Sequence, residues 1–183
     1  MKNEINAGTR ITKLEAVVRQ LETAIILWFN SGDSLSIHTL SSAAYQILYD
    51  INKHLNGPSM TPDSGIIKPE NRKEWMRALK AWPNFLKHAD NDPAETIVFN
   101  SAVNEHILFE SIIIFSNIYR EKRPIFQCFH MWMIINESVW FKPEYIERIR
   151  KTVPIEQFKK LDKGEFFNEM LPIFTSGIIH TTN

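Results

Sequence analysis

The chain has 183 residues, of which 44% are hydrophobic and 23% are charged, and this is the profile of a globular protein. Its 21 basic residues balance 21 acidic ones, which excludes the overall positive charge typical of a dedicated nucleic-acid binder and leaves only a local basic patch open. The single cysteine, Cys128, excludes an internal disulfide and a zinc site built from cysteines.

No apolar run approaches the length of a membrane-spanning helix, and the first ten residues lack the apolar core of a signal sequence. We therefore expect a cytoplasmic protein that has no membrane among its partners.

Two long helices are predicted at the start of the chain. From Ile11 to Trp28, apolar residues recur every three or four positions, which is the pattern of one helix face. Thr12 and Glu15 have the spacing of a capping box, so the regular helix is expected to begin beside them. Gly32 suits the left-handed position that follows a helix.

Asp33 or Ser34 is expected to cap the second helix, which the residues Asn-Gly-Pro at 56–58 end. A short turn joins the two helices, so they should form an antiparallel hairpin. The predicted apolar stripe of the second helix consists of Ile37, Leu40, Ala44, Ile47, Ile51 and Leu55.

Pro69 favours the start of a third helix over residues 69–82. Pro83 lacks a backbone N–H and clashes with the preceding turn, so a kink or a new helical start is expected there. The composition of residues 89–93 predicts a turn, and residues 95–99 are too few to assign to a strand.

A fourth helix is predicted over residues 101–122, capped by Asn100 or Ser101. Its middle is apolar on all sides, so it should lie at the centre of the protein. Further helices are predicted over residues 124–137, 143–151, 155–161 and 165–174. We expect an all-α, single-domain helical bundle over residues 1–176, with an N-terminal antiparallel helix hairpin, and a tail over residues 177–183.

The stretch WPNFLKHADNDP, at residues 82–93, is the first candidate site. If Pro83 starts a helical turn, Asn84 and His88 are four residues apart and share a face. Lys87 does not share this face, because adjacent side chains on a helix diverge by about 100°. Histidine suits proton transfer near neutral pH, so Asn84 and His88 are the candidate catalytic residues.

Asp90 or Asp92 would orient the imidazole of His88 from the turn. The alternative interpretation is structural. In that case Asn84 and Asp90 satisfy backbone groups, and His88 closes the C-terminus of the helix, where a positive charge is favoured.

The second helix adds His38, Tyr45 and Tyr49, spaced seven and four residues apart along the flank of its apolar stripe. One interpretation is a polar wall that faces His88 and takes part in binding. The other is a pair of half-buried tyrosines with a histidine at the rim, since tyrosine commonly buries its ring and keeps its hydroxyl in water.

Two pairs of acid and imidazole have helical spacing, Asp50 with His54 and His106 with Glu110. The chain lacks the Glu-x-x-His pattern of di-iron bundles and the His-Glu-x-x-His pattern of zinc proteases. We therefore interpret both pairs as ordinary surface pairs and expect no metal site and no cofactor. Glycine-rich phosphate loops are absent as well.

Two segments carry a resemblance to known proteins. His38 to Tyr45 match H-T-L-x-x-A-A-Y, and Asn84 to Pro93 match N-F-x-K-H-A-D-x-D-P. With these signatures the chain resembles a group of uncharacterised bacterial all-helical proteins over most of residues 14–120. The second signature is fairly specific, and the resemblance carries no activity with it.

More loosely, the chain is similar to the HEPN superfamily of helical bundles. These are often dimeric, and many are ribonucleases or nucleotide-modification partners in toxin–antitoxin and phage-defence systems. Their motif is an arginine, a polar residue and a histidine, with four to six residues between arginine and histidine. Asn84 and His88 match the last two positions, whereas Pro83 stands at the arginine position.

The resemblance implies that His88 would help a ribose 2′-hydroxyl attack the phosphate while an arginine steadies the phosphate charge. In this chain Lys80, Lys87 or Arg77 would have to replace that arginine, and Lys87 points away from the face of His88.

Two functions remain as hypotheses. The first is a HEPN-like protein that binds RNA or a nucleotide in a toxin–antitoxin or defence context, with a metal-independent ribonuclease-like activity if it is an enzyme. The second is a non-enzymatic interaction or scaffold protein, either a homodimer or the partner of another chain. The candidate residues are His88 and Asn84 for catalysis, and His38, Tyr45, Lys87, Asp90 and Asp92 for binding.

Overall fold

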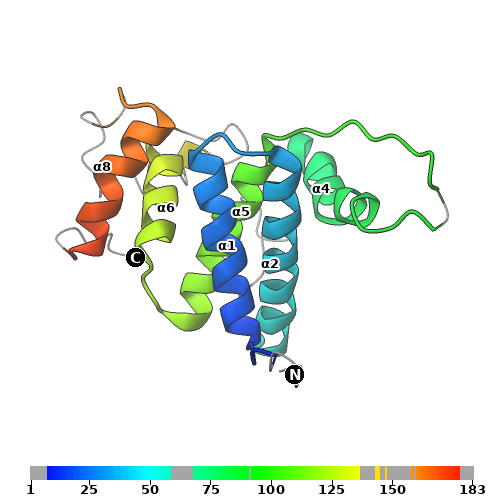
Figure 1. Ribbon diagram of the computed structural model, residues 1–183, viewed down its shortest axis with the longest axis horizontal. Helices are drawn as coiled ribbons and strands as arrows, with labels where there is room; N and C mark the ends of the chain where they lie inside the picture. The colour runs from blue at the N-terminus through cyan, green and yellow to red at the C-terminus, as the bar shows by residue number, and fades with distance from the viewer. Residues whose placement is uncertain are drawn as a thin grey trace, which may run out of the picture.

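The computed structural model describes residues 8–58, 68–90, 92–136 and 160–177, together with residues 143, 144, 147 and 158. Within these residues the fold is all-α, and six α-helices pack as a bundle (Figure 1), as the sequence predicts. None of the helices in this part of the chain combines the length and the apolar character that a membrane crossing requires.

The N-terminal hairpin consists of α1 (Lys13–Phe29) and α2 (Ser34–His54), which lie side by side. The Thr12 hydroxyl accepts a hydrogen bond from the Glu15 N–H at 3.1 Å, and the Glu15 carboxylate accepts one from the Thr12 N–H at 2.7 Å. This confirms the predicted capping box. The Asp33 carboxylate caps α2 by accepting a first-turn N–H at 2.8 Å.

The turn between these helices differs from the prediction in one detail. Ser31, not Gly32, takes the left-handed conformation, with φ 53°. The Gly32 N–H donates to the Leu27 carbonyl at 2.7 Å, and glycine suits this position because a Cβ there would lie only 3.0 Å from the same oxygen, a tight contact. The Ser31 N–H donates to the Trp28 carbonyl at 3.2 Å, which completes a Schellman motif.

The buried side of α2 is rotated away from the predicted stripe. His38, Tyr45 and Leu48 are buried, whereas Ile51 is half-buried and Leu55 is 58% exposed. The reason is that α2 packs against α1, α4 and α5 together, so its covered surface is broader than one apolar stripe. Polar side chains on that surface are tolerated where hydrogen-bond partners meet them.

The short 3-10 turn η1 (Pro69–Asn71) leads into α4 (Arg72–Phe85). This helix passes through Pro83 without a break, and beyond it the Leu86 N–H still donates to the Trp82 carbonyl at 3.0 Å. The predicted new helical start at Pro83 is therefore wrong. Pro83 lacks the N–H of an i→i−4 hydrogen bond, so one backbone hydrogen bond is missing from the last turn of α4.

The central helix is α5 (Val103–Tyr119), which packs against α1, α2, α4 and α6, as its all-round apolar middle predicts. Pro124 opens α6 (Pro124–Asn136), and α8 (Lys163–Thr175) packs mainly on α6. Figure 1 shows α6 and α8 on one side of the hairpin and α4 on the other.

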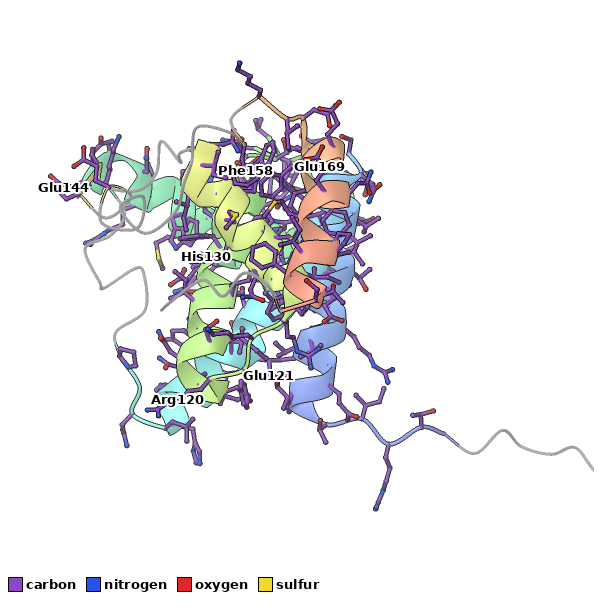
Figure 2. All side chains as sticks on the ribbon, turned by 90° about the vertical axis from the view of Figure 1, so that its left-hand side faces the viewer. Arg120, Glu121, His130, Glu144, Phe158 and Glu169 are labelled. Atoms are coloured by element: carbon purple, nitrogen blue, oxygen red, sulfur yellow. The ribbon has the colours of Figure 1, made fainter. Side chains whose placement is uncertain are left out.

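The two ends of this bundle are marked in Figure 2, where Glu121 lies at the turn between α5 and α6, and Phe158 and Glu169 lie at the opposite end. Arg123 secures the turn, because its guanidinium contacts both Glu121 and Glu22 of α1 at 2.9 Å. The turn is therefore tied to the N-terminal hairpin.

The helices predicted over residues 143–151 and 155–161 lie largely outside the described residues. The predicted tail lies outside them as well, apart from Gly177.

Candidate functional site: an open acidic pocket beside helix α4

One face of α4 borders an open pocket. The pocket is lined on this side by Ala81, Asn84, Phe85 and His88, which have the i, i+3, i+4, i+7 spacing of one helical face. Although α4 ends at Phe85, the His88 N–H donates to the Asn84 carbonyl at 3.0 Å, so helical spacing continues through His88. Asn84 and His88 thus share a face, and both side chains are exposed.

The chain that follows α4 forms the other side of the pocket. This side is lined by Asp90, Asp92, Glu95 and Ile97. The pocket has a volume of about 430 Å³. In Figure 1 this chain leaves α4, arcs outward on the right and returns to α5. The Glu95 N–H donates to the Asp92 carbonyl at 2.9 Å and closes a turn in the arc.

The described lining of this pocket is acidic. It contains three carboxyl groups, one imidazole and one carboxamide, and no lysine or arginine. Protonated Glu95 can donate a hydrogen bond to the Asp92 carboxylate, and this bond, together with the negative charge of Asp92, raises the pKa of Glu95 above its usual range. The two carboxyl groups are therefore close together, and a cation placed between them would relieve their repulsion.

The basic residues near this site do not line the pocket. Lys87 is exposed, and its side chain diverges from the shared face of Asn84 and His88, as helical geometry predicts. Arg77 and Lys80 are also exposed and are also absent from the lining. The arginine substitute that the HEPN resemblance requires is thus missing from the described lining.

The opposite face of α4 packs into the interior. Trp82 contacts Phe99 with ring centroids 5.0 Å apart, and both rings contact His38, at 5.6 Å and 5.2 Å. His38 is 0% exposed, and it does not line the pocket. Both interpretations of His38 are therefore wrong. It does not belong to a polar wall of α2 that faces His88, and it is not a histidine at the rim of the core.

Both ring nitrogens of His38 have partners. Asn104 donates from its amide nitrogen to the Ser34 carbonyl at 2.8 Å, so its amide oxygen faces His38 Nδ1, also at 2.8 Å. Nδ1 therefore carries a hydrogen in this arrangement, and Nε2 lies 3.3 Å from the Ser42 hydroxyl. Burial lowers the pKa of His38, and the Asn104 hydrogen bond opposes this shift.

Tyr45 is also buried, on the α2 face that carries His38, and only Tyr49 of this group is exposed. The structure thus brings together Asn84, His88, Asp90 and Asp92, and it leaves His38, Tyr45 and Lys87 outside the pocket. The pocket therefore gives no support to the binding roles predicted for the latter three.

The two pairs of acid and imidazole have different surroundings. Asp50 and His54 are exposed, as expected of a surface pair. His106 and Glu110 are buried in the central helix α5, so their interpretation as a surface pair is wrong. Among the described residues, no group of three or more histidine, cysteine, aspartate or glutamate side chains is arranged to hold a metal ion.

Four lining residues were not singled out from the sequence: Ala81, Phe85, Glu95 and Ile97. A signal existed for the first two, because the spacing that relates Asn84 to His88 also places them on the same helix face. No sequence signal existed for Glu95 and Ile97, because their position depends on how the arc folds back toward α4.

Comparison of the chain with protein-family models, with curated proteins and with solved structures found no match.

Proposed function

We propose that this protein is a non-enzymatic interaction protein that binds a cationic group of a protein partner in the pocket beside α4. The observation that carries the proposal is the lining, where Asp90, Asp92 and Glu95 supply three carboxyl groups and the described lining residues include no lysine or arginine. A concave site lined by one sign of charge concentrates ligands of the opposite sign.

The alternative is a HEPN-like protein that binds RNA or a nucleotide. Its support is that Asn84 and His88 face one open pocket, as the resemblance expects. A phosphate in the same pocket would face carboxylates, whereas enzymes that act on phosphates surround the developing charge with cationic groups or backbone donors. The charge of the lining therefore favours a cationic ligand over a nucleic acid.

Binding of short fluorescent probes by purified full-length protein tests the proposal. We expect a peptide with a central lysine to bind, its affinity to fall as sodium chloride is raised, and single-stranded RNA of similar length not to bind. The variant Asp92→Asn/Glu95→Gln should weaken peptide binding at least tenfold.

The matched control is Asp50→Asn/Glu169→Gln, which makes the same change in net charge at exposed positions outside the pocket lining. It should change the affinity less than twofold. RNA cleavage that disappears in His88→Ala, while the melting temperature stays unchanged, would overturn the proposal in favour of the alternative.

A further inference from the structure

The segment Thr96–Phe99, on the arc between α4 and α5, has the side-chain pattern of an extended strand. Thr96 and Val98 are exposed, Val98 by 84%, whereas Ile97 and Phe99 are half-buried against the core. Side chains of an extended chain alternate in this way between two faces. Figure 1 shows no helical turn in the arc on its return to α5.

The backbone of this segment has no backbone partner within the described part of the chain. No backbone–backbone hydrogen bond there involves an N–H or a carbonyl group of residues 96–99. An extended chain with unpaired groups along its edge is a template for pairing with another strand. Such pairing is one of the general modes by which proteins bind extended peptides.

The segment is also held in place from inside. The Phe99 ring lies against the rings of Trp82 and His38, at 5.0 Å and 5.2 Å. The next residue, Asn100, donates from its side chain to the Glu74 carboxylate of α4 at 2.6 Å, and its side-chain oxygen accepts from the Ala102 N–H at 3.1 Å. A segment anchored in this way has less conformational freedom to lose when a partner pairs with it.

The charge beside the segment selects the partner. Ile97 belongs both to the segment and to the lining of the acidic pocket, so the segment borders the pocket that Asp92 and Glu95 also line. A peptide lying along the edge would project alternate side chains toward this face. Charge complementarity therefore calls for a lysine or an arginine at the position next to the pocket.

We propose that an extended basic peptide segment of a partner protein pairs with the backbone of Thr96–Phe99 and places a lysine or arginine side chain in the acidic pocket. This inference rests on the proposed function and adds to it the conformation of the ligand. The exposed side chain of Val98 would lie beside the residues of the peptide that face the same way.

The experiment uses seven-residue probes of alternating threonine and valine around a central lysine. One probe is unmodified, one carries N-methyl groups on alternate backbone amides, and one has glutamate in place of lysine. We expect the unmodified probe to slow hydrogen exchange at two or more amides of residues 96–99 at least tenfold, as measured by NMR. N-methylation should weaken binding at least tenfold, and the glutamate probe should not bind.

Variants of the protein at Val98 also test whether the probe pairs with the backbone of residues 96–99. Val98→Pro removes one backbone donor at an exposed position, and it should weaken binding of the lysine probe, whereas Val98→Ala keeps the donor and should bind within twofold of the native chain. If Val98→Pro does not fold, the N-methylated probes still test the pairing.

The possible failures are distinguishable. If the lysine probe binds through Asp92 and Glu95, but N-methylation has no effect and residues 96–99 gain no protection, backbone pairing is refuted and the proposed function stands. If no cationic probe binds, or if RNA binds instead, the proposed function fails and this inference fails with it. A homodimer that buries Thr96–Phe99 in the absence of any probe would also overturn it.

Discussion

The interior around His38 and the pocket around His88 are neighbouring regions with opposite properties. Trp82 and Phe99 close over His38, whereas Asn84 and Ile97, which are close to them in sequence, line the pocket. His38 is fully buried and has partners at both ring nitrogens, and His88 is exposed beside three carboxyl groups.

Each of these histidines belongs to one of the two short signatures in the sequence, and yet their roles differ. The His38 region is a structural element that holds α2, α4 and α5 together, because Asn104 of α5 and Trp82 of α4 both contact its ring. The His88 region is available to a ligand. The comparison shows that burial and surroundings, not the residue type within a motif, determine what a histidine does.

The largest expected effect is a loss of stability at acid pH, and its source is the buried side chain of His106. His106 is 2% exposed, and burial lowers its pKa to about 3, against about 6.5 in an unfolded chain. Below pH 6.5 the unfolded chain therefore binds a proton that the folded protein does not. The free energy of unfolding should fall by up to about 5 kcal/mol as the pH drops from 6.5 to about 3.

Urea denaturation as a function of pH measures this effect. His106→Leu should remove part of the pH dependence, since the unfolded variant no longer gains the proton. The control Ile107→Ala, which opens a cavity in the same helix and keeps His106, should retain the native pH dependence. Equal pH dependence in His106→Leu and the native protein would show that His106 does not make this contribution.

The second effect compares the two signature histidines directly. His38→Ala should lower the free energy of unfolding by about 2–4 kcal/mol, because it leaves a cavity and removes the partner of the buried Asn104 oxygen. His88→Ala should change it by less than about 0.5 kcal/mol, as is usual for an exposed side chain. Denaturation of both variants at pH 7.5 provides the measurement, and similar losses would contradict the division into interior and pocket.

The smallest expected effect is the pH dependence of binding, and it is also the sharpest test of the pocket. The pKa of Glu95 is raised by Asp92, so Glu95 becomes neutral at a higher pH than an ordinary glutamate. Affinity for the lysine probe should therefore decline as the pH falls through this raised range. In Glu95→Gln the decline in this pH range should be lost, and titration of probe anisotropy against pH would detect the difference.

Several features of the fold were predictable because their causes are local. The capping box of Thr12 and Glu15, the Asp33 cap and the opening of α6 at Pro124 depend on residues within one helical turn. The joint placement of Asn84 and His88 on one side of α4 was also predictable, because four residues of helix return a side chain to the same face.

Other features depend on contacts between distant parts of the chain. The burial of His38 and Tyr45 follows from α4 and α5 covering the side of α2 that its own apolar pattern does not mark. The continuity of α4 through Pro83 is a similar case. The rule that proline disrupts a helix applies most strongly in the helix interior. Pro83 lies in the last turn of α4, and the residue at which α4 ends was not evident from the proline alone.

By itself, the sequence determined the class of the protein, the helical hairpin and the shared face of Asn84 and His88, because helix periodicity and capping act over a few residues. Only the tertiary structure decided that the arc after α4 folds back, that Glu95 and Ile97 complete an acidic pocket, and that Thr96–Phe99 presents an unpaired backbone edge in the described chain. These arrangements depend on Phe99 packing against Trp82 and His38, which come from different parts of the chain.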